Sequence, residues 1–287
     1  MKRVLILSLY LPLLLACEKS IDYPLPQEPK KISIDARVLA GEPVRAYVGT
    51  TEPALSTDAP QLLRDAQVLL LEDGQVVDSL KQSSGLGREH YEGTYLPTAG
   101  HRYQVKVRYP GLAPAFGEDM VKTAVPITGY TTDSTNREFT MSFKDPAGKG
   151  DFYRLQAYFS GNGSETPLFL STIDPLVDFF YDLDDEIFQG SEKAGQSAFL
   201  KDENFDGKTR NLRFKAIGIG GSGEFSDSLV LQLTRISEDF YKHEKSKGIQ
   251  YVAGGNPLAE PVQVYSNISN GYGIVAGGNS DRVLIVP

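Results

Sequence analysis

The sequence of 287 residues contains no tryptophan, one cysteine and three histidines. A single cysteine cannot form a disulfide within one chain, and it excludes zinc sites built from several cysteines. Three histidines offer little for metal or proton chemistry, and the missing tryptophan weakens any case for stacking on sugar rings. Basic side chains are also few, since 29 Lys and Arg stand against 37 Asp and Glu. The net charge of −8 therefore disfavours binding to the phosphates of nucleic acid.

Glycine, proline, tyrosine and phenylalanine are plentiful, with 28, 17, 15 and 14 residues. Aromatic residues favour strands, whereas glycine and proline favour tight turns. Hydrophobic residues make up 40% of the chain and charged residues 23%, which is typical of a folded protein. The composition predicts many short strands, and the length fits one or two domains.

An apolar run from Val4 to Ala16 follows Lys2 and Arg3. It is shorter than the roughly 20 residues of a membrane-spanning helix and is typical of a secretory signal peptide. The run ends directly before Cys17, the only cysteine, in a pattern that resembles a bacterial lipobox. We expect residues 1–16 to be removed and Cys17 to carry lipid such as palmitate. The alternative is a plain signal peptide followed by an incidental cysteine.

Lipid chains of this kind hold a protein on a membrane without crossing it, because each buried methylene contributes roughly 0.8 kcal/mol. Residues 17–31 carry Pro24, Pro26 and Pro29 among polar residues, which is typical of an extended tether. At roughly 3 Å per residue, this tether reaches about 40 Å from the lipid. Loss of the two basic residues of the signal peptide leaves 27 basic against 37 acidic side chains, a net charge of −10.

Hydrophobic residues with a period of two begin at Ile32 and predict half-buried strands. The hydrophobic residues between Asp65 and Glu72 lie on both faces, so we expect that strand to be buried on both. Asp73-Gly74 favours a two-residue hairpin. Strands without a helix predict an immunoglobulin-like β-sandwich over residues 32–126. The predicted strands of this part are Ile32–Val38, Val44–Val48, Asp65–Glu72, Val76–Leu80 and Tyr103–Tyr109.

Residues 127–287 predict a second β domain, mostly antiparallel and with one short helix, so the whole fold is all-β. Ser237 is a favoured helix N-cap and is followed by two acidic residues. We expect the helix to end at Gly248 and to expose His243. The predicted strands are Phe139–Phe143, Phe152–Phe159, Leu212–Ala216, Leu229–Leu233 and Val283–Val286.

Two glycine patterns resemble the dinucleotide fingerprint G-x-G-x-x-G. They are Gly218, Gly220 and Gly223 and, in a looser form, Gly271, Gly273 and Ala276. The motif binds a pyrophosphate only where a helix begins at its third small residue. The first pattern is followed by strand-like alternation, and the second leaves too few residues for a βαβ unit. We interpret both as turns and expect no cofactor.

The residues Asp202, Asn204, Asp206 and Gly207 reproduce the first half of a calcium-binding loop. Oxygen atoms at alternate positions converge in such a loop, and the glycine permits its sharp turn. The ninth and twelfth positions, however, hold arginines, where a cation needs oxygen ligands. We interpret the segment as a polar turn between strands and predict no metal site, with calcium binding as the alternative.

Within residues 174–188, six acidic residues are interleaved with four aromatic ones. Such a segment could bind a cation, a basic peptide or a sugar ring. The candidate contacts are Tyr181, Asp182, Asp184 and Asp185. The alternative, which we favour, is a solvated loop whose aromatic side chains pack on the second core.

Catalytic motifs are absent from the sequence, which has no P-loop, no G-x-S-x-G elbow and no H-E-x-x-H. The histidines His90, His101 and His243 stand in no recognisable catalytic or zinc motif. We therefore predict no catalytic residue. A hydrolase that uses the acidic segment is the less favoured alternative.

Eight segments of the chain carry a resemblance to a known family. They are Cys17, Asp65–Val68, Asp73-Gly74, Gly100–Val105, Phe143–Pro146, Asp151–Arg154, Phe205–Gly207 and Pro261–Ile274. In this order they resemble a family of envelope lipoproteins of the Bacteroidetes, known as a domain of unknown function (family 4249).

The resemblance implies a two-part β protein on the outer membrane, often encoded beside TonB-dependent receptors, and it assigns no catalytic residue. We therefore expect a non-enzymatic binding or accessory lipoprotein, anchored on the outer membrane through Cys17, that acts with a TonB-dependent transporter. The alternative is a structural or adhesive cell-surface lipoprotein. No nucleic acid partner is expected in either case.

Overall fold

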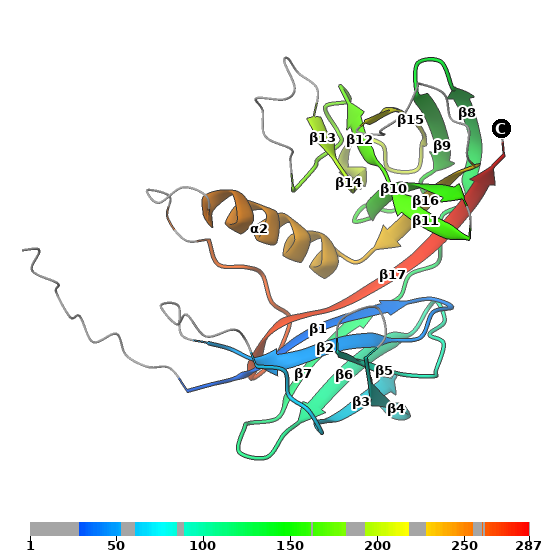
Figure 1. Ribbon diagram of the computed structural model, residues 1–287. Coiled ribbons are helices and arrows are strands. Elements are labelled where there is room, and N and C mark those ends of the chain that lie inside the picture. Colours follow the sequence, from blue (N-terminus) through cyan, green and yellow to red (C-terminus); the bar gives the residue numbers. More distant parts are fainter. Residues whose placement is uncertain are drawn as a thin grey trace, which may run out of the picture.

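A computed structural model describes residues 29–52, 61–84, 89–161, 163–181, 193–217, 228–254, 260 and 262–286. These residues form two β units that share one long strand, and a single α-helix lies beside that strand (Figure 1). The predicted all-β, sandwich-like class is confirmed. The lipobox and the first glycine pattern lie outside the described residues.

The N-terminal unit is built from strands in which buried and half-buried residues alternate, as the period of two predicts. Buried side chains of its strands meet in one core. Its strands are β1 (Ile32–Leu39), β2 (Arg45–Thr50), β3 (Gln67–Glu72), β4 (Gln75–Ser83), β5 (His90–Glu92), β6 (Arg102–Arg108) and β7 (Ala115–Met120).

The hairpin between β3 and β4 is confirmed. Asp73 and Gly74 have φ angles of 46° and 85°, which a two-residue turn of this kind requires. The prediction that β3 is buried on both faces is wrong. Val68 and Leu70 are fully buried, but Leu69 and its neighbour on the same face are half-buried, because only one face meets the core.

The C-terminal unit contains the predicted strands together with several short ones. Its strands are β8 (Ile127–Asp133), β9 (Glu138–Lys144), β10 (Phe152–Gly161), β11 (Ser164–Pro167), β12 (Phe169–Thr172), β13 (Lys193–Gly195), β14 (Ala198–Lys201), β15 (Thr209–Ile217) and β16 (Ser228–Ile236), with a 3₁₀ turn, η3 (Asp202–Asn204), after β14. One sheet has the order β13-β12-β15-β9-β8, and its inner face packs against β10 and β16.

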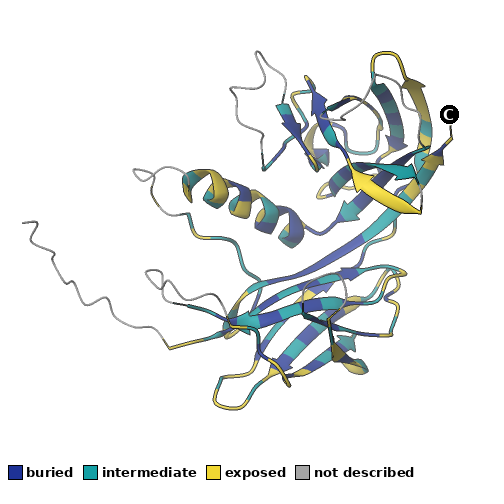
Figure 2. Ribbon diagram, viewed as in Figure 1, coloured by how far each residue is buried: buried dark blue, intermediate teal, exposed yellow. Residues whose placement is uncertain are grey.

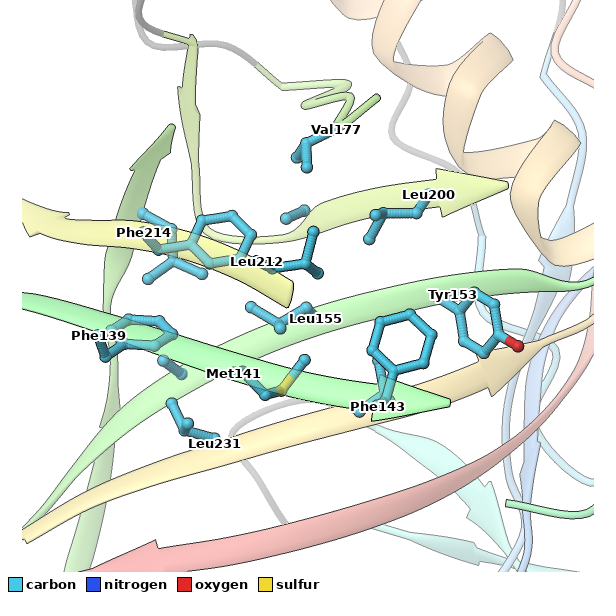
Figure 3. Close-up of a cluster of buried hydrophobic side chains, with 14 of the residues drawn as sticks. Phe139, Met141, Phe143, Tyr153, Leu155, Val177, Leu200, Leu212, Phe214 and Leu231 are labelled. Atoms are coloured by element: carbon cyan, nitrogen blue, oxygen red, sulfur yellow. The ribbon is translucent and has the colours of Figure 1, made fainter. Parts of the chain in front are cut away.

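Aromatic and aliphatic side chains from both layers fill the space between them (Figure 3). Phe139 stacks on Phe214 with ring centroids 5.6 Å apart, and Phe143 lies 4.9 Å from the ring of Tyr153. Burial of such rings stabilises this unit, because each removes a large apolar area from water. Figure 2 shows the resulting buried stripes along the strands.

The final strand, β17 (Gly271–Ile285), belongs to both units. Its first half pairs in parallel with β1, from Gly271 to Gly278, and its second half pairs antiparallel with β16. The interpretation of Gly271, Gly273 and Ala276 as a turn is therefore wrong. Gly273 is needed in the strand because a Cβ there would lie 2.0 Å from the carbonyl oxygen of Ile34. The division of the chain near residue 126 stays a prediction.

The helix α2 (Glu238–Gly254) begins where the sequence predicts. The Ser237 hydroxyl oxygen accepts the backbone N–H of Phe240 at 3.0 Å, which is the N-cap hydrogen bond. Phe240 packs on the face of the sheet formed by Ile236, Ile274 and Ala276. No helix among the described residues is long and apolar enough to cross a membrane.

Two details of α2 differ from the prediction. The helix passes through Gly248, which serves for close packing instead of ending it, since a Cβ there would lie 2.1 Å from the carbonyl oxygen of Phe180. His243 is buried rather than exposed, and its Nδ1 lies 2.7 Å from the carbonyl oxygen of Tyr265. Burial lowers the pKa of His243.

A buried carboxylate, Asp119 of β7, connects the two units and the helix. Its oxygens accept the backbone N–H of Gly277 at 2.7 Å, the N–H of Met120 at 2.7 Å and the hydroxyl of Ser237, the N-cap of α2. Burial raises the pKa of Asp119 to about 6. The carboxyl thus favours its protonated form more in the folded protein than in the unfolded chain.

We predict that Asp119 makes stability depend on pH between about 4 and 6. Because the pKa rises from 3.8 to about 6 on folding, the contribution of its protonation is present below pH 4 and is lost as the pH rises through 6. The unfolding free energy of the wild type should fall over this range by about 3 kcal/mol relative to Asp119→Asn. Urea denaturation followed by circular dichroism at pH 4 to 7 measures the difference. The exposed neighbour Glu118→Gln is the control, and an equal pH response in both variants would contradict the prediction.

Candidate functional site

The structure describes only part of the predicted acidic contact site. Asp182, Asp184 and Asp185 lie outside the described residues, so their role stays a prediction. Tyr181 lies beside α2, where its hydroxyl donates to Glu244 at 3.4 Å and its ring contacts Tyr251 edge-on. Burial and the neighbouring Glu244 carboxylate raise the pKa of Tyr181.

The preceding part of this segment is packed against the protein. Phe179 is buried in the C-terminal core, and Phe180 stacks on Phe199 with centroids 4.4 Å apart. Asp178 accepts the hydroxyl of Tyr241 at 3.1 Å and lies 3.8 Å from Lys193. The expectation that the aromatic side chains pack on the core is confirmed for Phe179.

Three carboxylates from two loops meet beside the end of β9. Asp202 and Asp206 belong to the predicted half of a calcium loop, and Asp145 joins them from the loop after β9. Each offers one oxygen, and these oxygens lie within 4.8 Å of one another, close enough for one cation to contact all three. Local spacing in the sequence could not reveal Asp145 as a member of this cluster, because it lies far along the chain from Asp202 and Asp206. It stands at the end of a strand, before a proline.

Each carboxylate of this cluster also accepts a hydrogen bond from a loop amide. The N–H donors to Asp145, Asp202 and Asp206 are Gly207, Gly150 and Gly148, at 2.9, 2.9 and 2.7 Å. All three glycines have positive φ angles, which turn their amides toward the carboxylates. The cluster therefore closes the two loops against each other.

The arginines expected to face this cluster point elsewhere. Arg210 pairs with Asp174, and Arg213 pairs with Glu138. The two guanidinium groups therefore do not take the place of calcium ligands, and the prediction from the sequence is wrong for these side chains. The ninth and twelfth positions of the predicted calcium loop belong to the strand β15, which carries their side chains away from the carboxylates.

Both arginine pairs lie instead on the wall of an open cavity of about 710 Å³. The cavity lies beside β15 where its neighbour β12 ends. The two strands pair only from Phe169 to Ser171 of β12, so the rest of β15 has no strand partner on that side among the described residues. The chain then continues as residues 173–176, which also line the cavity. Sequence reasoning missed this cavity, since its residues come from three separate segments.

Two buried polar atoms on this wall have no hydrogen-bond partner within the described part of the chain. They are the hydroxyl oxygen of Ser171, a residue that is 1% exposed, and Nε of Arg210. A buried polar group without a partner costs about 1–3 kcal/mol. Such groups on a cavity wall are typical of places where water or a ligand completes the hydrogen bonding.

Comparisons with known proteins identify a family but no activity. A family model described as "Domain of unknown function (DUF4249)" matches residues 18–283. No curated protein matches the chain.

Among solved structures, the chain is similar to a DUF4785 family protein from Legionella pneumophila subsp. pneumophila str. Philadelphia 1, with 14% identity and a TM-score of 0.26. The alignment covers 71% of this chain and 52% of that one, so the chain spans about half the length of that protein. At this TM-score the similarity supports no argument about function.

We predict that Asp145, one of the two buried members of the carboxylate cluster, matters more for stability than the half-buried Asp206. Asp145→Ala leaves the hydroxyl of Tyr153 and an amide without an acceptor, and should lower the unfolding free energy by about 3 kcal/mol. Asp206→Ala removes one amide contact and should cost about 1 kcal/mol. Urea denaturation of both variants measures the two losses, and equal losses would contradict the prediction.

Proposed function

The chain belongs to the DUF4249 family, and from this premise we propose that it is a non-enzymatic binding or accessory lipoprotein that acts with a TonB-dependent transporter of the outer membrane. The observation that carries the binding role is the cavity beside β15, with its two unpartnered buried polar atoms. Polar groups that are left open in the free protein suit a site that is completed by a ligand.

A partner protein is supported by the exposed apolar end of α2. Ile249, Tyr251 and Val252 are 47%, 72% and 63% exposed. Tyrosine and aliphatic side chains grouped in this way are typical of protein contacts, because their burial contributes to association. The expected anchor at Cys17 and the proline-rich tether of residues 17–31 would allow this face to reach a neighbour in the same membrane.

We predict that the thiol of Cys17 anchors the protein on the membrane. Cys17→Ser should move the full-length protein from the detergent phase to the aqueous phase in a phase-partition experiment, because two or three acyl chains are lost. Mass spectrometry of the wild type should find lipid on the N-terminal peptide. Ser20→Ala is the control, since it alters a nearby hydroxyl and leaves the thiol. A variant that stays in the detergent phase would contradict the prediction.

We also predict that a tag placed after Pro287 recovers a TonB-dependent receptor from solubilised membranes. Tyr251→Asp should reduce the recovery by about tenfold or more, as for an aromatic residue at the centre of an interface. Val76→Asp changes a residue that is 59% exposed in the N-terminal unit and should leave the recovery unchanged.

Recovery of no receptor under several growth conditions would reject this role. The structural or adhesive alternative would be selected instead if deletion of the protein altered attachment and left nutrient uptake intact.

A further inference from the structure

The wall of the β15 cavity carries one basic side chain that is not paired with an acidic one among the described residues. Arg210 is neutralised by Asp174, and Arg213 by Glu138. Lys215 also lines the cavity, and no ion pair joins it to any residue that the structure describes. Three basic and two acidic side chains therefore give this wall a net charge of +1, whereas the whole chain has a net charge of −8. A concave surface of opposite sign to its protein concentrates anions.

A second hydrogen-bond donor lies beside Lys215. Ser171 and Lys215 are paired in register on neighbouring strands. Residues paired in this way point to the same face, with their Cβ atoms about 5 Å apart. The hydroxyl of Ser171 is one of the two unpartnered groups of the wall. An ammonium and a hydroxyl at this spacing can both donate to one carboxylate.

The rest of the cavity suits an organic molecule rather than a small inorganic ion. A volume of about 710 Å³ lies within the range of small-molecule sites. The amide of Asn211 lines it together with the apolar side chains of Ile173 and Leu176, which an inorganic anion would leave uncovered. A divalent cation is disfavoured, because both acidic side chains of the wall already pair with arginines.

We propose that this cavity binds a small organic carboxylate, whose carboxylate group lies between the ammonium of Lys215 and the hydroxyl of Ser171. The inference deepens the proposed binding function, on which it rests, by naming the class of ligand. It requires no receptor, so it can be tested on the isolated protein.

Isothermal titration calorimetry of the full chain in detergent micelles tests the proposal with gluconate and citrate as carboxylate probes. Sorbitol is the matched neutral control, because it is gluconate with the carboxylate reduced to an alcohol. Inorganic phosphate tests whether any anion suffices. We expect binding of at least one carboxylate, no binding of sorbitol and weaker binding of phosphate.

Three variants locate the site. Lys215→Met should weaken carboxylate binding by about tenfold and reduce its dependence on salt, since the charge that attracts the ligand is lost. Ser171→Ala should weaken it by about fivefold without lowering the thermal unfolding midpoint, because the hydroxyl has no partner in the free protein. Lys81→Met removes an exposed charge from the N-terminal unit and should change neither property.

Failure of both carboxylates to bind at tens of millimolar would overturn the proposal. Phosphate binding as tight as carboxylate binding would overturn the assignment to an organic carboxylate, and an equal effect of Lys81→Met would overturn the location. Carboxylate binding without recovery of a receptor would reject the transporter role and keep the site. Recovery of a receptor without carboxylate binding would reject the carboxylate site and keep the transporter role.

Discussion

One strand, β17, is the constraint on which the rest of the structure depends. Its first half supplies Val275 to the N-terminal core and its second half supplies Ile285 to the C-terminal core. Backbone N–H and C=O groups need partners when they are buried, so neither unit can release β17 without leaving a neighbouring strand unpaired. The two units are therefore held together by the backbone pairing of one shared strand.

The backbones of β7 and β17 lie so close together that Gly277 has no room for a side chain. The same close contact buries the carboxylate of Asp119. A Cβ on Gly277 would lie 2.5 Å from the carbonyl oxygen of Met120. The backbone approach that this allows brings the Gly277 amide to the buried Asp119. Arg37 of β1 adds a second link, since it pairs with Glu244 of α2 at 2.9 Å and lies over the ring of Phe240. Packing and polar contacts thus fix α2 against the shared strand.

Some buried polar groups of the C-terminal unit have hydrogen-bond partners within the described residues and others have none. The groups without partners locate the candidate binding site. The carboxylates of Asp145, Asp202 and Asp206 are used by loop amides, so that cluster stabilises the fold as it stands. The β15 cavity instead contains Ser171, which is buried and has no partner among the described residues. Folding places that hydroxyl there at a cost in stability, which a ligand would offset.

The sequence by itself determined the local structure: the alternation of the strands, the Asp73-Gly74 hairpin and the N-cap at Ser237, because these depend on neighbouring residues. It also marks Cys17 as the expected anchor. Only the tertiary structure decided that Gly273 and Gly248 serve close packing, that β17 joins both units, and which side chains line the cavity. Those features depend on contacts between residues distant along the chain, and a periodic pattern carries no information about which distant strand will lie alongside.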